Sequence, residues 1–152
     1  MAITNKEKTL IQDNLVAEYL CIRKYEQYAA LSSDQQLKQV FTDLANKEKE
    51  HATTLKNILT QNGINNQNLF ESYTSPQSDL SSMQNSLGTS DAQLLNDALS
   101  TEKHVSSSYN NAVLESVDPN IRKQLQHIQQ EEQGHAETLF NAMKSRGWYN
   151  VE

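Results

Sequence analysis

The chain of 152 residues contains one cysteine, two prolines, four glycines and no long hydrophobic run. The single cysteine, Cys21, excludes an internal disulfide, a zinc site built from several cysteines and a Cys-x-x-Cys redox pair. With so little glycine and proline, the sequence lacks the turn signals that a many-stranded β fold needs. No apolar stretch approaches the ~20 residues that cross a membrane, so we expect no membrane partner. Long helices are the expected structure.

Positive charge is also in short supply, with 13 Lys and Arg against 19 Asp and Glu and a formal net charge of −6. Phosphate groups repel a negative protein, so we expect no nucleic acid partner. The N-terminal residues contain no apolar stretch of the signal-peptide type, which predicts a cytoplasmic protein. The length suits one domain with its own buried core, and we predict a single domain over residues 1–152.

Four segments carry apolar residues at three- and four-residue steps, the pattern of an amphipathic helix. We predict helices over about 5–31, 35–62, 91–116 and 119–146. In the first of them the predicted inward-facing positions are 11, 15, 18, 22, 25 and 29. Very few residues separate the first helix from the second and the third from the fourth, which predicts two antiparallel hairpins. The predicted fold class is an all-α four-helix bundle.

The connection between the hairpins, about 64–89, is long and polar. A structureless loop of this length is uncommon in a compact domain unless it has a role. A helix of about 28 residues is ~42 Å long, and 26 extended residues can cover that distance. We therefore predict a crossover along the whole bundle, with a disordered segment as the alternative. The side chains expected to hold it to the bundle are Leu69, Phe70, Tyr73, Leu80 and Met83.

The sequence contains an internal repeat with an offset of 84 residues. Residues 10–64 align with residues 94–148 without a gap, and 14 of the 55 aligned positions are identical. Each half contains a glutamate, a tyrosine seven residues later, a second glutamate 30 residues after the first, and a histidine three residues after that. The repeat predicts that an approximate two-fold axis relates the hairpins.

Six acidic and imidazole side chains fall on the apolar stripes of the four helices: Glu18, Glu48, His51, Glu102, Glu132 and His135. Each hairpin brings its two glutamates to the same depth, because both lie fifteen residues from the turn. Each unpaired buried charge costs several kcal/mol, and a domain has only about 5–15 kcal/mol of stability. Protonation could neutralise some carboxylates, whereas two divalent cations balance all four. Oxygen ligands with one imidazole per metal favour Fe or Mn over tetrahedral Zn.

Residues close in sequence to these six are expected to have supporting or purely structural roles. Tyr25 and Tyr109 lie two turns beyond their glutamates, and we predict that each hydroxyl bonds a ligand side chain on a facing helix. The alternative is a core aromatic ring whose hydroxyl reaches solvent. Cys21 is expected to be a small buried filler, and Glu50 and Glu131 are expected to be solvated.

The segments LANKEKEHATTL and IQQEEQGHAETLF resemble the second and fourth helices of rubrerythrin-type ferritin-like domains, a resemblance that covers about residues 8–148. Residues 95–149 are similar to the spore coat F family, including the closing Gly-Trp-Tyr. The resemblance implies a ferritin-like bundle that binds two iron ions, or manganese, or one of each. The implied ligands are the six residues above, with Glu18 and Glu102 terminal and Glu48 and Glu132 bridging. Rubrerythrins usually add a cysteine-rich rubredoxin module, which a single cysteine excludes here.

The function implied by the resemblance is the reduction of hydrogen peroxide or oxygen, or the oxidation of ferrous iron, at the metals. Turnover then requires an external electron donor, because no internal donor is visible in the sequence. One alternative is a structural protein of the spore-coat type, located in the spore coat, whose metal site only stabilises the bundle. Another is an iron-storage subunit. A homodimer or a larger homo-oligomer is expected.

Overall fold

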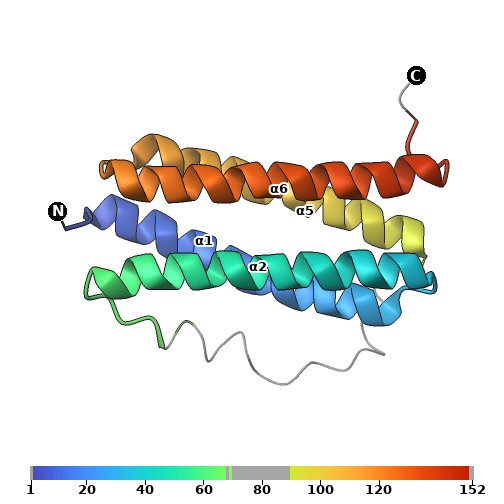
Figure 1. The fold of residues 1–152 in the computed structure, drawn as a ribbon, viewed down its shortest axis with the longest axis horizontal. Coiled ribbons are helices and arrows are strands. Elements are labelled where there is room, and N and C mark those ends of the chain that lie inside the picture. Colours follow the sequence, from blue (N-terminus) through green and yellow to red (C-terminus); the bar gives the residue numbers. More distant parts are fainter. Residues whose placement is uncertain (1, 68, 70–89, 151–152) are drawn as a thin grey trace.

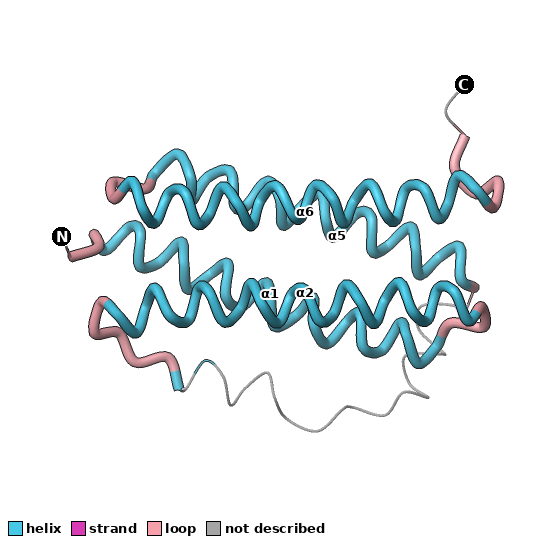
Figure 2. Tube along the Cα trace, viewed as in Figure 1, coloured by secondary structure: helices cyan, strands magenta, loops and turns pink. Residues whose placement is uncertain are grey.

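The computed structural model describes residues 2–67, 69 and 90–150. Four long α-helices make up this part of the chain: α1 (Asn5–Leu31), α2 (Gln35–Gln61), α5 (Asp91–Glu115) and α6 (Pro119–Ser145). α1 and α2 form one antiparallel hairpin and α5 and α6 the other, and the hairpins pack together mainly through α1 and α5 (Figure 1). Short loops close each hairpin (Figure 2). The prediction of an all-α four-helix bundle is confirmed.

The start of α5 lies beside the turn of the first hairpin. The carboxylate of Asp91 accepts hydrogen bonds from the backbone N–H groups of Ser33, at 3.0 Å, and Asp34, at 3.2 Å. α2 begins at this turn and ends 27 residues later, about 40 Å away. The end of α2 and the start of α5 therefore lie at opposite ends of the bundle, as the predicted crossover requires. Leu69 is half-buried; the other predicted anchors, Phe70, Tyr73, Leu80 and Met83, lie outside the described residues.

Local capping chemistry fixes where the helices begin and end. Thr4 and the glutamate three residues later form a capping box at the start of α1. Asp34 and Asp118 cap α2 and α6 by accepting hydrogen bonds from backbone N–H groups in the first turn. Gly63 and Gly147 follow the ends of the same two helices with φ of 75° and 71°, a left-handed conformation that glycine adopts without strain.

Each hairpin turn is also capped by a carboxylate from the other hairpin. Glu7 of α1 accepts hydrogen bonds from the backbone N–H groups of Val117, at 2.6 Å, and Asp118, at 3.2 Å, in the second turn. Asp91 of α5 does the same for the first turn. The two caps are related by the 84-residue offset, although Glu7 precedes the aligned segment. The two-fold relationship therefore extends to the ends of the bundle.

We expect the substitution Glu7→Ala to lower the free energy of unfolding by about 2–3 kcal/mol, because it removes the charged acceptor of the backbone N–H groups of Thr4, Val117 and Asp118. Glu7 is 2% exposed. Although burial raises its pKa, hydrogen bonds from Thr4, Val117 and Asp118 leave that pKa lowered overall. Its contribution is thus present above about pH 4.5 and is lost as the pH falls below that value. Urea denaturation measures the effect, and Glu137→Ala, on the exposed face of α6, is the control.

The core differs in detail from the predicted stripe on α1. Ile22 and Ala29, predicted to face inward, are only half-buried, whereas Cys21 and Tyr28 are 3% and 1% exposed. α1 packs against both α2 and α5, so its buried surface is wider than one narrow stripe. Among the described residues, no helix is both long enough and apolar enough to cross a bilayer.

Candidate metal centre

The structure brings all six predicted ligand residues together inside the bundle. α1 and α5 each contribute one glutamate, and α2 and α6 each contribute a Glu-x-x-His pair whose members lie on one helix face. The six residues and their exposed fractions are Glu18 0%, Glu48 0%, His51 2%, Glu102 0%, Glu132 1% and His135 8%. These groups occupy positions where a bundle ordinarily places leucine or isoleucine.

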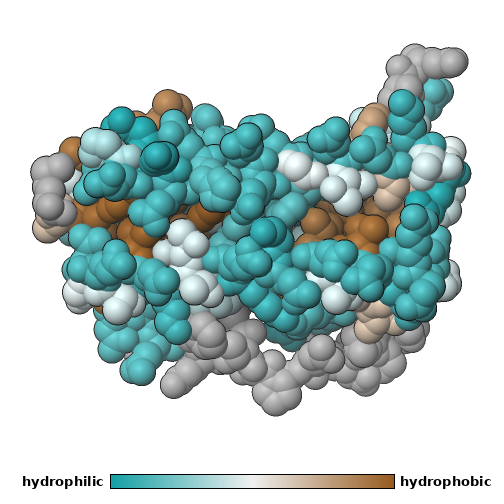
Figure 3. Space-filling model, viewed as in Figure 1, coloured by the Kyte–Doolittle hydropathy of each residue, from teal (hydrophilic) through white to brown (hydrophobic). Residues whose placement is uncertain are grey.

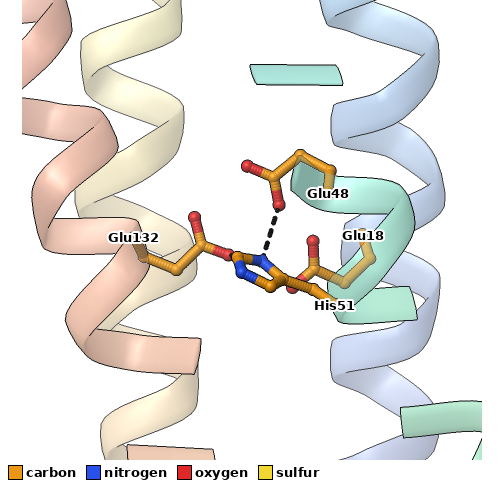
Figure 4. Close-up of side chains that lie close together, drawn as sticks. All are labelled: Glu18, Glu48, His51 and Glu132. Carbon is orange, nitrogen blue, oxygen red and sulfur yellow. Dashed lines mark hydrogen bonds and ion pairs between the residues drawn. The ribbon is translucent and has the colours of Figure 1, made fainter. Parts of the chain in front are cut away.

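The six residues form two overlapping groups, in each of which one nitrogen or oxygen atom per residue lies within 4.8 Å of all the others. The first group is Glu18, Glu48, His51 and Glu132 (Figure 4), and the second is Glu48, Glu102, Glu132 and His135. Glu48 and Glu132 belong to both groups. The 84-residue offset converts one group into the other, so the site follows the symmetry of the repeat.

The two shared glutamates lie between the two histidines. Glu48 places Oε2 3.2 Å from Nδ1 of His51 and Oε1 2.8 Å from Nδ1 of His135. Glu132 places Oε1 3.1 Å from Nδ1 of His51 and Oε2 3.2 Å from Nδ1 of His135. The imidazole rings stack with centroids 5.6 Å apart. Each shared carboxylate therefore offers one oxygen to each half of the site, the arrangement that a bridging ligand requires.

The other two glutamates are each held by a tyrosine from the other hairpin. The hydroxyl of Tyr109 donates to Oε1 of Glu18, and the hydroxyl of Tyr25 donates to Oε1 of Glu102. Both tyrosines are fully buried, and burial next to a carboxylate raises the pKa of each phenol, so both stay protonated donors. Glu18 Oε1 lies 3.6 Å from Nδ1 of His51. These are the contacts that the spacing of the repeat predicts for Tyr25 and Tyr109.

The four carboxyl groups divide into two neutral acids and two anions. Burial and the neighbouring Glu48 raise the pKa of Glu18 well above its ordinary value, and burial raises that of Glu102 to about 8. Burial acts the same way on Glu48 and Glu132, but hydrogen bonds, chiefly from neighbouring glutamates and the two histidines, outweigh it and leave the pKa of both carboxyls lowered. Without cations, Glu18 and Glu102 are protonated at neutral pH.

Both histidines are cationic in the same state. Burial alone would lower the pKa of each imidazole, but the surrounding carboxylates raise it, to about 11 for His135 and higher for His51. Two imidazolium groups thus balance the two ionised carboxylates, and the cation-free site carries no net charge. With two divalent cations bound, all four carboxylates ionised and both imidazoles neutral, the site again carries no net charge.

Five buried atoms of the site make no hydrogen bond of good geometry. Three of them, Glu48 Oε1, Glu132 Oε2 and His135 Nδ1, have only the ion-pair contacts given above, and the other two are Glu18 Oε2 and Glu102 Oε2. A buried polar atom left unpaired costs about 1–3 kcal/mol. All five atoms belong to the six ligand residues and converge on the space between the helices. Oxygen donors with one imidazole in each half suit iron or manganese, so the residues present fit a pair of such ions.

The expectation that Glu131 is solvated is wrong. Glu131 is half-buried, and its Oε2 lies 2.7 Å from Nε2 of His51, on the side of the ring away from the site. It precedes Glu132 in α6, at the edge of the inward stripe, and only the packing of α6 beside α2 brings it to the histidine. Glu50 is exposed as expected, and Cys21 is buried beside the carboxylates, where burial and the negative charges raise the pKa of its thiol.

The structure is similar to that of a two-domain protein from Anabaena variabilis that contains DJ-1/ThiJ/PfpI-like and ferritin-like domains. The TM-score is 0.75 at 16% sequence identity, and the match covers 96% of this chain and 38% of the other. The fold is ferritin-like. The ferritin-like bundle thus accounts for well under two thirds of that neighbour's length.

The second half of the ferritin-like bundle has a further relative. Residues 90–152 match the Coat F domain family, a segment that includes both α5 and α6. This match confirms the similarity to the coat F family that the sequence indicates. No curated protein matches the chain.

Proposed function

We propose that the chain is a dinuclear metal protein that binds two iron ions, or manganese, or one of each, and there reduces hydrogen peroxide or oxygen or oxidises ferrous iron. The observation that carries this proposal is the position of Glu48 and Glu132, each of which offers one oxygen to each histidine. The ferritin-like fold supports the proposal, since bundles of this fold place such ligand sets on facing helices.

Each residue of the site has a distinct task in this proposal. Glu48 and Glu132 would hold both ions, while Glu18 with His51 and Glu102 with His135 would each complete one position. Bound as a reduced pair, the ions would supply the two electrons that reduce a peroxide. The tyrosine hydroxyls fix the orientation of the terminal carboxylates, and the apolar residues above and below the site exclude bulk water.

A small oxidant can approach the site from the groove between α2 and α6. A cavity of about 390 Å³ opens there and is lined in part by His51, Thr54, Ile128 and Glu131. Figure 3 shows this face of the molecule, which is largely hydrophilic, with hydrophobic surface visible along the groove. Cys21 is a buried free thiol in a chain with one cysteine, so it has no second thiol with which to pass on two electrons as a disulfide. We therefore propose that an external donor returns the electrons. We also propose a cytoplasmic homodimer or larger homo-oligomer.

Rapid mixing of the Fe²⁺-loaded protein with hydrogen peroxide tests the proposed function. We expect the bound iron to be oxidised at least about tenfold faster than free Fe²⁺, a difference of about 1.4 kcal/mol in barrier. The variant Tyr109→Phe, which removes the hydroxyl that holds Glu18, should keep its metal and react more slowly. An oxidation rate equal to that of free Fe²⁺ would contradict a redox role.

A structural role of the spore-coat type is the second candidate, because residues 90–152 match the Coat F domain family. In that case metal binding raises the melting temperature and the bound metal shows no accelerated reaction with peroxide. A melting curve with and without metal, measured on the same sample as the rapid mixing, separates the two functions. The structural candidate places the protein in the spore coat.

A further inference from the structure

The two halves of the metal centre differ on the outward side of their histidines. His51 directs Nε2 toward Oε2 of Glu131 at 2.7 Å. The 84-residue offset places Lys47 at the position equivalent to Glu131, and an ammonium group cannot accept a hydrogen bond from an imidazole. Within the part of the chain that the structure describes, the carboxylates near His135 all face its Nδ1 and none faces Nε2. Only one of the two imidazoles is therefore backed by a carboxylate.

Besides its bond to His51, Glu131 makes two longer contacts near the surface. Its side chain is 28% exposed, and its other carboxylate oxygen, Oε1, lies 3.6 Å from Nζ of Lys47 and 3.6 Å from Nε2 of His127. It also forms part of the wall of the cavity between α2 and α6. Glu131 thus lies at the outward edge of His51, in the wall of this cavity.

A carboxylate in this position changes how an imidazole binds a cation. By accepting the outward N–H, it fixes the tautomer whose lone pair lies on the other nitrogen, and it makes that nitrogen a stronger donor. Nδ1 of His51, the nitrogen left free in this way, is the one that faces Glu48 and Glu132. Loss of such a partner typically costs 10- to 100-fold in metal affinity.

We propose that Glu131 is a positioning residue that makes the position at His51 the tighter of the two, so that divalent cations fill the centre in a fixed order, the His51 position first. This inference rests on the proposed metal centre. The two ions share Glu48 and Glu132, so any first ion weakens the binding of a second. A difference between two affinities therefore proves nothing by itself, and the deciding observation is which histidine the tighter ion requires.

Titration of the metal-free protein with Co²⁺ tests the order, with calorimetry for the affinities and the visible absorption of Co²⁺ for the ligand environment. We call the more tightly bound of the two Co²⁺ ions the tighter equivalent and the other the weaker equivalent. We expect His135→Ala to retain the tighter equivalent and His51→Ala to lose it. Glu131→Gln keeps the volume of the side chain and removes its charge, and we expect it to weaken the tighter equivalent by about 10- to 100-fold. The weaker equivalent should change by less than about threefold, a selectivity that a general loss of structure would not produce.

Lys47→Gln is the matched control, because Lys47 contacts Glu131 but occupies the position without a histidine partner. It should change the tighter equivalent by less than about threefold. The inference is overturned if Glu131→Gln weakens both equivalents alike, if it has no greater effect than Lys47→Gln, or if the tighter equivalent depends on His135. Failure of the unmodified protein to bind any Co²⁺ would instead overturn the metal centre itself.

Discussion

Replacing Glu132 with glutamine is expected to lower the metal content from about two ions per chain to fewer than about 0.5, the largest loss that one neutral substitution can cause here. The physical reason is that Glu132 supplies one oxygen to the half of the site at His51 and the other to the half at His135. An amide offers one uncharged oxygen in place of a carboxylate with two, so one position loses its ligand and the other keeps only a weaker, uncharged one. Glu48→Gln should have the same effect, and elemental analysis after dialysis measures both.

The terminal glutamates provide the graded comparison. Glu18 belongs to one of the two groups, so Glu18→Gln should leave about one ion per chain and preserve the half of the site at His135. Glu50→Gln changes an exposed residue of α2 that directly precedes His51 in the sequence, and it should leave the content unchanged. Equal losses in the Glu132 and Glu18 variants would show that Glu132 does not bridge.

Metal binding should depend steeply on pH, because the cation-free site holds protons that the metals must displace. Near pH 7 one proton must leave each of Glu18, Glu102, His51 and His135, a release of four protons for two divalent cations. Since protons compete with the cations, the affinity rises with pH. Above about pH 8 the proton of Glu102 is already lost, and the release falls to three.

Calorimetric titration with Mn²⁺ in buffers of different ionisation enthalpy counts these protons. Release of fewer than two protons near pH 7 would contradict the proposed ionisation of the site.

The same pKa values predict how the stability of the cation-free protein depends on pH. Because the fold raises the pKa of Glu102 to about 8, the stabilisation from its protonation is complete below about pH 4.5 and is lost as the pH rises through about 8. The loaded protein should not show this loss.

The sequence alone is sufficient to predict the bundle and to identify the residues that meet at its centre. Glu18 and Glu48 interrupt apolar stripes of helical period, and equal distances from the turn place them at one depth in the hairpin. The 84-residue offset then repeats the same residues as Glu102 and Glu132, which makes a chance occurrence improbable. The helical period of the stripes and the equal distances from the turn are properties of a single helix and a single hairpin, and such local geometry can be predicted from the sequence.

The parts that sequence reasoning missed depend on contacts between the two hairpins. Glu131 lies at the edge of its helix stripe, and only the packing of α6 beside α2 brings it to His51. Glu7 and Asp91 look like ordinary first-turn acidic residues, yet each caps the turn of the opposite hairpin. An acidic residue at a helix start is common on any surface, so neither residue stands out by itself, and the sequence signal that relates them is their 84-residue spacing.

Diffraction from crystals of the metal-loaded protein, recorded on both sides of the iron and manganese absorption edges, examines the metal centre most directly. The ligand arrangement predicts two anomalous peaks inside the bundle, one beside Nδ1 of His51 and the other beside Nδ1 of His135, with Glu48 and Glu132 contacting both. A single peak, or peaks only on the surface of the protein, would contradict a dinuclear centre built from these six side chains.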